Sequence, residues 1–388
     1  VGNLEYLGMR IDYAFNLPSI FGMLSVYLLL FVLAVKLTKS RLCGALTALL
    51  FTFRSSFTVF RYMAEQPKGT VFQALRDNTE FLSYTQNENW GLWNLNVYCN
   101  QRHLAFSLAI LLLAVLLFFP YVSAMGETLL KEKNRLKQLK LLFFTKTAFA
   151  VKDIRLAVGM GFVLGGIAFW NGSVLVAALA MLFFMAAVSE YRLDYLISAL
   201  IARALALFQS AFFVDGVAVS PAFYFGFLSQ NKTVFGVLLF IAELTGIVLL
   251  TSFAGACLLK GTRRYFLLVS FVPFVLAFML SLTPDIVVNH KWIMLSLMFV
   301  SIFSAYLITW LWYRRDWLVR LLALFLVVLL TATGIYDYTI VLKRNKNYLS
   351  YALDDPVTEW IAENATCDDM FLTPYYSLNN IVLGGAML

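Results

Sequence analysis

Charged residues are scarce in this sequence. Asp, Glu, Lys and Arg make up 13% of its 388 residues, about half the share that soluble globular proteins carry. Hydrophobic residues account for 61%, and the mean hydropathy is +0.79. Apolar runs close to the roughly 20 residues that span a bilayer recur along most of the chain. Because a helix satisfies its own backbone hydrogen bonds in lipid, the sequence predicts an all-α polytopic membrane protein.

Cysteine and histidine are rarer still, with four and two copies. The cysteines have unrelated spacings and form no metal or redox motif, and whether Cys99 and Cys367 form a disulfide stays open. The sequence has neither a glycine-rich phosphate loop nor a nucleophile elbow. A divalent metal could bind His103, His290 and Asp285, although no spacing motif supports such a site. The cofactor is therefore unknown.

The apolar runs predict about ten transmembrane helices. Two of them have about 15 residues each, which is short for a hydrocarbon core of about 30 Å, so they are either tilted neighbours or a re-entrant hairpin. The predicted spans are residues 18–36, 42–60, 104–125, 156–170, 174–189, 195–213, 234–259, 265–282, 292–313 and 318–336.

The basic residues favour one orientation of these spans in a plasma membrane. Short cytoplasmic loops are enriched in Lys and Arg, and five alternate connections hold 18 of the 30 Lys and Arg residues. Topology thus accounts for the net charge of +8, and no nucleic-acid partner is expected. The predicted cytoplasmic connections are residues 36–41, the basic loop 126–155, 190–194, 260–264 and 314–320. The predicted extracytoplasmic segments are residues 1–16, the long loop 61–103, 214–233, 283–291 and the C-terminal tail.

The tail after the last span is soluble in composition. Asp355 and Pro356 are a helix cap followed by proline at the first helical position, which predicts a helix over 357–364. Residues 370–373 are typical of a strand, so the tail is expected to be part of a small extracytoplasmic α/β domain. The predicted domains are a transmembrane domain at 1–342 and this partial domain at 343–388.

A dense polar stretch precedes the third span. Residues 90–103 hold two Trp, three Asn, one Arg and one His, and they run directly into an apolar helix. A second polar turn, 289–291, lies at the same predicted depth and again places a histidine beside a cation. Since Arg offers a phosphate a bidentate fork and Lys a point charge, the two stretches predict a site for a lipid-linked phosphate. The candidate phosphate-binding residues are Asn100, Gln101, Arg102, His103, Asn289, His290 and Lys291. Two other interpretations stay open, namely interfacial anchoring and unrelated side chains that snorkel at two helix ends.

Two charged residues fall inside predicted spans. Arg203 lies within 195–213 and Glu243 within 234–259, and charges at such depth are costly unless they are paired or functional. Because these spans are consecutive and antiparallel, we expect an Arg203–Glu243 pair near mid-membrane. The pair either fixes the helix register or belongs to an ion relay.

The polar stretches resemble those of the bacterial polytopic GT-C-type glycosyltransferases. The resemblance rests on scattered short matches over most of the chain. Because the sequence begins at Val1 and ends within a soluble segment, we expect that both of its ends are cut. The matching segments are Asn100 to His103, Asn289 to Lys291, the Gly-rich short span before Asn171, Trp360 to Asn364 and Met370 to Pro374.

The resemblance implies an inverting transferase in the bilayer. It would move a sugar from a polyprenyl-phosphate donor to a glycan, lipid or protein acceptor on the extracytoplasmic face. The family's base is an acid in the first outer loop, which we expect upstream of Val1. Glu5, Asp12 and Glu88 are weaker candidates for the base. The alternative function is a transporter or a lipid-linked glycan flippase, and a third is a scaffold that acts through its tail.

Overall fold

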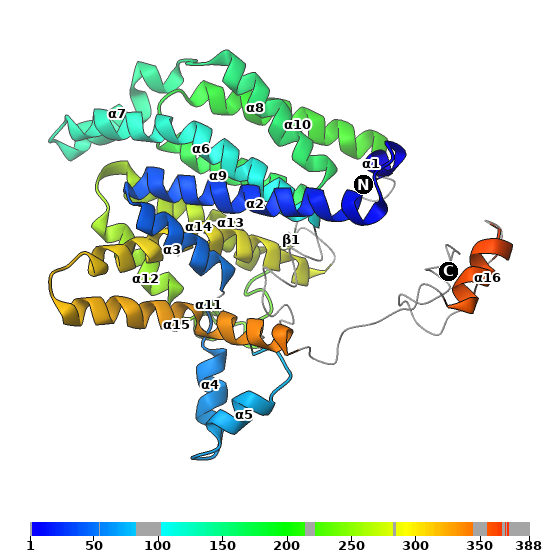
Figure 1. Cartoon of the computed structure of the whole chain (residues 1–388). Coiled ribbons are helices and arrows are strands. Elements are labelled where there is room, and N and C mark those ends of the chain that lie inside the picture. Colours follow the sequence, from blue (N-terminus) through cyan, green and yellow to red (C-terminus); the bar gives the residue numbers. More distant parts are fainter. Residues whose placement is uncertain are drawn as a thin grey trace. The chain divides into compact units, whose positions relative to one another are not determined.

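A computed structural model describes residues 2–53, 55–82, 102–213, 222–281, 285–343, 355–366, 369 and 371. The chain divides into two units, Val1–Thr339 and Ile340–Leu388. The first unit is built from helices (Figure 1). Within the described residues its β-structure is one short antiparallel pair, formed by β1 (Ala222–Phe223) and β2 (Leu280–Ser281).

Six helical segments are long and apolar enough to cross a membrane. A seventh results if two helices bent by 83° are taken together, so among the described residues the chain has six or seven such spans instead of ten. It is a mostly α-helical, multi-pass membrane protein. The six segments lie in α2 (Ile11–Thr38), α6 (Arg102–Leu130), α10 (Arg192–Phe213), η4 (Gly261–Tyr265) with α13 (Phe266–Met279), η5 (Ile286–Asn289) with α14 (His290–Trp312), and α15 (Trp317–Leu342). The bent pair is α11 (Val234–Thr245) and α12 (Val248–Leu258).

The two predicted short spans are confirmed as short apolar helices. They are α8 (Ile154–Gly166), extended by η3 (Ile167–Phe169), and α9 (Gly172–Ala187). Asp153 and Asn171 begin them, since each side chain accepts hydrogen bonds from backbone N–H groups of the first turn. The basic loop that precedes α8 contains two further helical segments, α7 (Arg135–Phe144) and η2 (Lys146–Phe149).

The predicted span 42–60 is wrong. Its apolar half forms α3 (Arg41–Thr52), which has only 12 residues. The chain then starts a new helix, α4 (Thr58–Glu65), and continues into α5 (Val71–Asp77). Residues 58–77 are therefore partly helical, although most of them fall in the predicted long loop. Short helices of mixed polarity give no long apolar run, and this is why hydropathy did not reveal them.

The predicted span 234–259 is interrupted because another part of the chain packs against it. The Phe57 N–H and the Ser56 hydroxyl both donate to the Glu243 carbonyl at the end of α11. The next turn contains Gly246 at φ +59°. A Cβ there would lie 2.6 Å from the Ser55 hydroxyl oxygen, so a larger residue does not fit. The bend thus depends on contacts between residues almost 190 positions apart.

Helix α14 is the centre of the first unit. It packs against α3, α12 and α13, and most of its side chains are buried. One contact is closer than side chains permit, because a Cβ on Gly255 of α12 would lie 1.9 Å from the Phe303 carbonyl oxygen. The backbones of α12 and α14 therefore touch, as they do at small-residue interfaces in membranes.

Gly255→Ala should consequently destabilise the protein. The added methyl group must push α12 away from α14, and overpacking of this kind costs about 1–3 kcal/mol. Reversible unfolding in mixed detergent micelles would measure the change. Gly159→Ala in α8 is the matched control, because a Cβ there meets nothing within 4 Å. Equal stability of the two variants would contradict the close packing.

The second unit contains α16 (Pro356–Asn364), which confirms the helix predicted in the tail. The Asp355 side chain accepts a hydrogen bond from the Val357 N–H at 2.9 Å, and proline follows it at the first helical position. Ile361 is buried and packs the helix, whereas Trp360 is 57% exposed. Most of the predicted strand at 370–373 lies outside the described residues.

Candidate functional site

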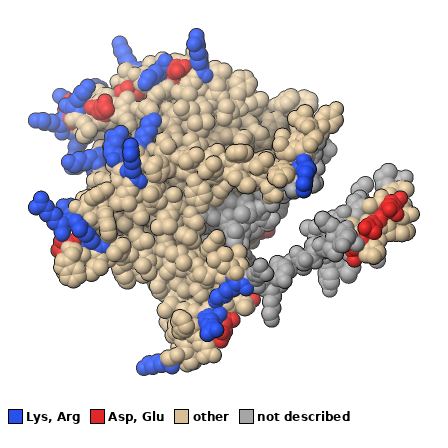
Figure 2. Space-filling model, viewed as in Figure 1, with Lys and Arg blue, Asp and Glu red and all other residues tan. Residues whose placement is uncertain are grey.

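The Lys- and Arg-rich connections of the first unit meet at one end of the helices. One cavity is lined by Thr38, Glu127 and Lys260, so it joins three of these connections. The fourth connection, 190–194, is attached to α6, because the Glu190 N–H donates to the Tyr121 carbonyl. The fifth connection, 314–320, follows the C-terminal end of α14, a helix whose Tyr306 lines the same cavity. In Figure 2 many of the visible Lys and Arg side chains gather on the side where Figure 1 shows α7. We call this the basic end, and it comprises residues 36–41, 126–155, 190–194, 260–264 and 314–320.

The other end of the same helices carries the predicted polar site. Phe106 of α6 and Trp170 contact each other edge to face, with ring centroids 4.8 Å apart. Trp292 Nε1 donates to the Ser173 carbonyl at 2.8 Å. The Gly226 N–H donates to the carbonyl of Phe278, close to the end of α13. We call this the polar end, and it comprises residues 102–106, 169–173, 222–233 and 285–292.

The turn that leads into α14 is held by its own polar side chains. Asn289 is buried, and its Nδ2 donates to the carbonyls of Ala277 (3.0 Å) and Leu280 (2.6 Å). His290 is also buried, and its Nδ1 lies 2.6 Å from the Val287 carbonyl, which requires the proton on that nitrogen. Both residues of the predicted site therefore position the turn. Lys291, which is half-buried, is the residue of this turn that carries a positive charge to the site.

The two halves of the predicted site begin helices that contact the same turn, residues 170–173, through the Phe106–Trp170 ring contact and the Trp292–Ser173 hydrogen bond. His103 is exposed at the start of α6, and Lys291 lies at the start of α14. Arg102 is the first residue of α6, and its side chain lies outside the described part. Asn100 and Gln101 also lie outside the described residues. His103 and Lys291 therefore lie at the same end of the helices, on two elements that contact one turn.

A second lysine at the polar end was not predicted. Lys232 Nζ lies 4.7 Å from the centroid of the Tyr224 ring and donates a hydrogen bond to the Phe227 carbonyl. The Tyr224 N–H donates to the backbone carbonyl of Met279 and so joins this loop to the end of α13. The sequence feature that could have identified Lys232 is its place in the predicted outer segment 214–233, with aromatic residues near it. Lys232 adds positive charge to the end that holds Lys291.

The predicted pair between Arg203 and Glu243 is corrected by the structure. Glu243 forms its ion pair with Arg61 of α4, which also lies 3.7 Å from Glu65. Arg203 is exposed on α10, a helix that packs mainly against α8. The prediction assumed that 234–259 is straight. The bend after Glu243 instead brings this carboxylate next to the segment that follows α3.

The remaining candidates are less defined. Glu5 and Asp12 lie in α1 (Gly2–Tyr6) and α2, where only their backbone is described. Glu88, Cys99 and Cys367 lie outside the described residues. Asp285 caps η5 by accepting from the Val287 N–H. In the described part of the chain, no three His, Cys, Asp or Glu side chains form a group that could hold a metal ion.

Comparisons with known proteins add no family to this description. No family model, characterised protein or solved structure matches the chain. A functional conclusion therefore depends on the chemistry of the polar end.

Proposed function

We propose that this chain is a membrane glycosyltransferase of the GT-C type. It moves a sugar from a polyprenyl-phosphate donor to a glycan, lipid or protein acceptor on the extracytoplasmic face of the plasma membrane. The observation that supports the proposal is that the starts of α6 and α14, which carry His103 and Lys291, contact the same turn at the polar end. The positive-inside rule supports this orientation, because it places the basic end in the cytoplasm and the polar end outside.

The chemistry needed from the polar end is charge stabilisation. When the sugar leaves the donor, negative charge accumulates on the polyprenyl phosphate, and a fixed cation stabilises that charge more than the initial state. Lys291 supplies an ammonium group and Arg102 a guanidinium fork. Asn289 and His290 keep the turn rigid through their hydrogen bonds to backbone carbonyls. Asn100 and Gln101 add neutral donors, and the polyprenyl chain stays in the bilayer.

The acceptor hydroxyl needs a base, and the proposal leaves it unassigned. Glu5, Asp12 and Glu88 belong to predicted outer segments and remain candidates. Single Ala variants of these three acids would identify the base by a loss of transfer that leaves donor binding intact.

A direct test uses the purified chain in lipid nanodiscs. A radiolabelled polyprenyl-phosphate sugar should bind, and unlabelled polyprenyl phosphate should compete for the same site, because both present the phosphate. A free sugar phosphate lacks the lipid and should compete poorly. If the labelled donor does not bind above the level of empty nanodiscs, the proposal is wrong.

A transporter or flippase is the second candidate function, and one observation favours it. Helices α11 and α12 are bent by 83° next to the Arg61–Glu243 ion pair, and interrupted helices near charges are common in transporters. Proteoliposomes separate the two functions. A flippase would move a lipid-linked sugar across the bilayer without any acceptor and would lose that movement in Glu243→Gln, whereas a transferase would leave the lipid in its leaflet.

A further inference from the structure

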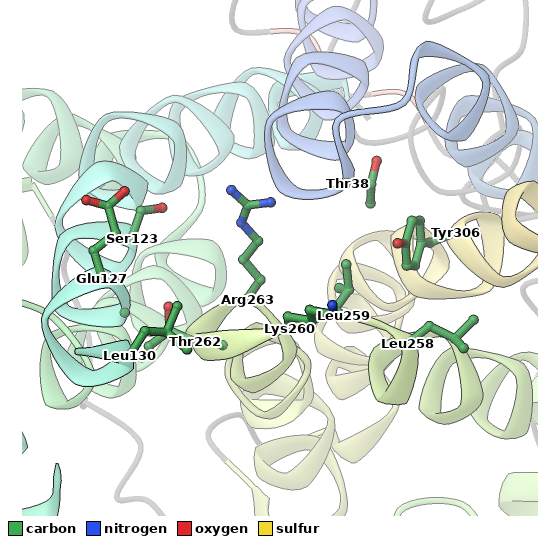
Figure 3. Close-up of a pocket in the computed structure, with 12 residues that line it drawn as sticks. Thr38, Ser123, Glu127, Leu130, Leu258, Leu259, Lys260, Thr262, Arg263 and Tyr306 are labelled. Atoms are coloured by element: carbon green, nitrogen blue, oxygen red, sulfur yellow. The ribbon is translucent and has the colours of Figure 1, made fainter. Parts of the chain in front are cut away.

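The turn η4 at the basic end separates two cavities. One has a volume of about 340 Å³, and Figure 3 shows Arg263 extending into it between Glu127 and Thr38. The second has a volume of about 520 Å³ and lies on the other side of Thr262, which lines both. The first cavity contains an acid together with its cations, whereas the second contains cations without any acid. Only the second therefore has the charge to select an anion.

The second cavity joins two arginines from different elements. Arg135 begins α7 and Arg264 belongs to η4, and both line the space together with Gln138. Within the described part of the chain, neither arginine forms an ion pair with a carboxylate. The Arg264 guanidinium instead lies 5.1 Å from the centroid of the Tyr265 ring, and its Nη2 donates to the Tyr265 hydroxyl at 3.3 Å. Two guanidinium groups without a carboxylate partner leave their remaining N–H donors available to a phosphate.

The walls of this cavity are fixed by the fold. Gln138 Nε2 donates to the carbonyls of Leu129 and Glu132 and so holds α7 against the end of α6. The Thr262 hydroxyl donates to the Val122 carbonyl at 3.1 Å. Gly126 permits this contact, because a Cβ there would lie 2.3 Å from the Thr262 hydroxyl oxygen. The two arginines are thus held on elements that are both anchored to α6.

The rest of the surroundings is apolar and reaches the membrane surface. The wall residues that are apolar are Leu129, Leu139, Leu142, Val188 and Tyr265. Helix α7 also exposes an apolar face made by Leu136, Leu139 and Phe143, which are 77%, 53% and 49% exposed. Exposed Lys137 and Lys140 lie beside that face. A short helix of this kind lies in the headgroup region of a membrane, with its apolar face toward the acyl chains.

We infer that this cavity binds the phosphate of an anionic phospholipid from the leaflet at the basic end. Arg135 and Arg264 hold the phosphate, the apolar wall receives the glycerol and the upper acyl chains, and α7 lies in the same leaflet. Basic pockets between transmembrane helices on the cytoplasmic side are suited to such headgroups. The inference does not depend on the proposed glycosyl transfer, because the cavity and the polar end are at opposite ends of the helices.

The test measures which lipids stay bound. The full chain is reconstituted with equal amounts of phosphatidylglycerol and phosphatidylcholine, extracted into mild detergent, and analysed by native mass spectrometry. We expect the wild type to retain phosphatidylglycerol preferentially, and each of Arg135→Gln and Arg264→Gln to lower that preference about fivefold. Arg263→Gln is the matched control, since it removes the neighbouring arginine of the same turn but does not line this cavity.

Two further arms make the result decisive. The Arg135→Lys, Arg264→Lys double variant keeps both charges and should keep most of the preference, which excludes misfolding as the cause of any loss. Glycerol 1-phosphate should not displace the bound lipid at equal concentration. The inference is overturned if both Gln variants keep the full preference, if the wild type has none, or if the soluble phosphate competes as well as the lipid.

Discussion

Lys291→Met is expected to lower sugar transfer about 100- to 1,000-fold, the range in which removal of one preorganised charge-stabilising group falls. Methionine keeps an apolar stem similar to that of lysine, so the half-buried position at the start of α14 stays filled. What is lost is the ammonium group that stabilises the departing phosphate in the proposed mechanism. The decrease should appear mainly in kcat, because in that mechanism the negative charge on the phosphate is greatest in the transition state.

The assay follows transfer of labelled sugar from the polyprenyl phosphate, with donor binding measured separately. Lys291→Arg should recover part of the rate, since it restores a positive charge with a different geometry. Lys133→Met, an exposed lysine of the basic end, should behave like the wild type. A transfer rate for Lys291→Met within threefold of the wild-type rate would show that this lysine does not stabilise the departing phosphate. If donor binding were intact in that case, the proposed function would still stand.

Asp194→Ala is expected to destabilise the protein by about 3–5 kcal/mol. Asp194 is fully buried in the first turn of α10. Its carboxylate accepts from the Tyr121 hydroxyl at 2.8 Å and from the N–H groups of Lys152 and Asp153 at 3.1 and 3.0 Å. It thereby joins α6, α10 and the start of α8. Alanine would leave all three donors without this acceptor.

Unfolding in mixed detergent micelles, followed by circular dichroism, would measure this loss. Tyr121→Phe removes one of the three donors and should cost less than Asp194→Ala. Asp316→Ala removes an exposed carboxylate that caps α15 through the Leu318 N–H, and such caps contribute about 1 kcal/mol. If the exposed cap proved as costly as Asp194, burial would not explain the effect.

Sequence patterns predicted those parts of the fold that depend on local hydropathy. The runs that form α2, α6, α10, α14 and α15 are long and apolar, so they can be recognised from hydropathy alone. The patterns failed where distant residues decide the backbone path. Residues 234–259 form a mostly apolar run, yet contacts from Ser55 to Phe57 accompany the break after Glu243.

The candidate site shows the same division. Predicted depth placed His103 and Lys291 on one face, and in the structure the helix starts that carry them contact the same turn. Predicted depth also suggested that Arg203 pairs with Glu243. In the structure the helix bends after Glu243, and Glu243 forms an ion pair with Arg61 instead. Sequence could not show that Asn289 Nδ2 and His290 Nδ1 bind backbone carbonyls around the turn, because those carbonyls are positioned by the end of α13 and by η5.

The bend between α11 and α12 has a consequence for the order in which this protein is made. The two helices have 12 and 11 residues, about 18 and 17 Å at 1.5 Å per residue, so neither crosses a core of about 30 Å alone. The whole apolar run is long enough to enter the bilayer as one straight segment. The residues that pack at the bend, Ser55 to Phe57, are synthesised well before it. We therefore expect the run to insert first as one segment and to bend afterwards, when it packs against residues 55–57.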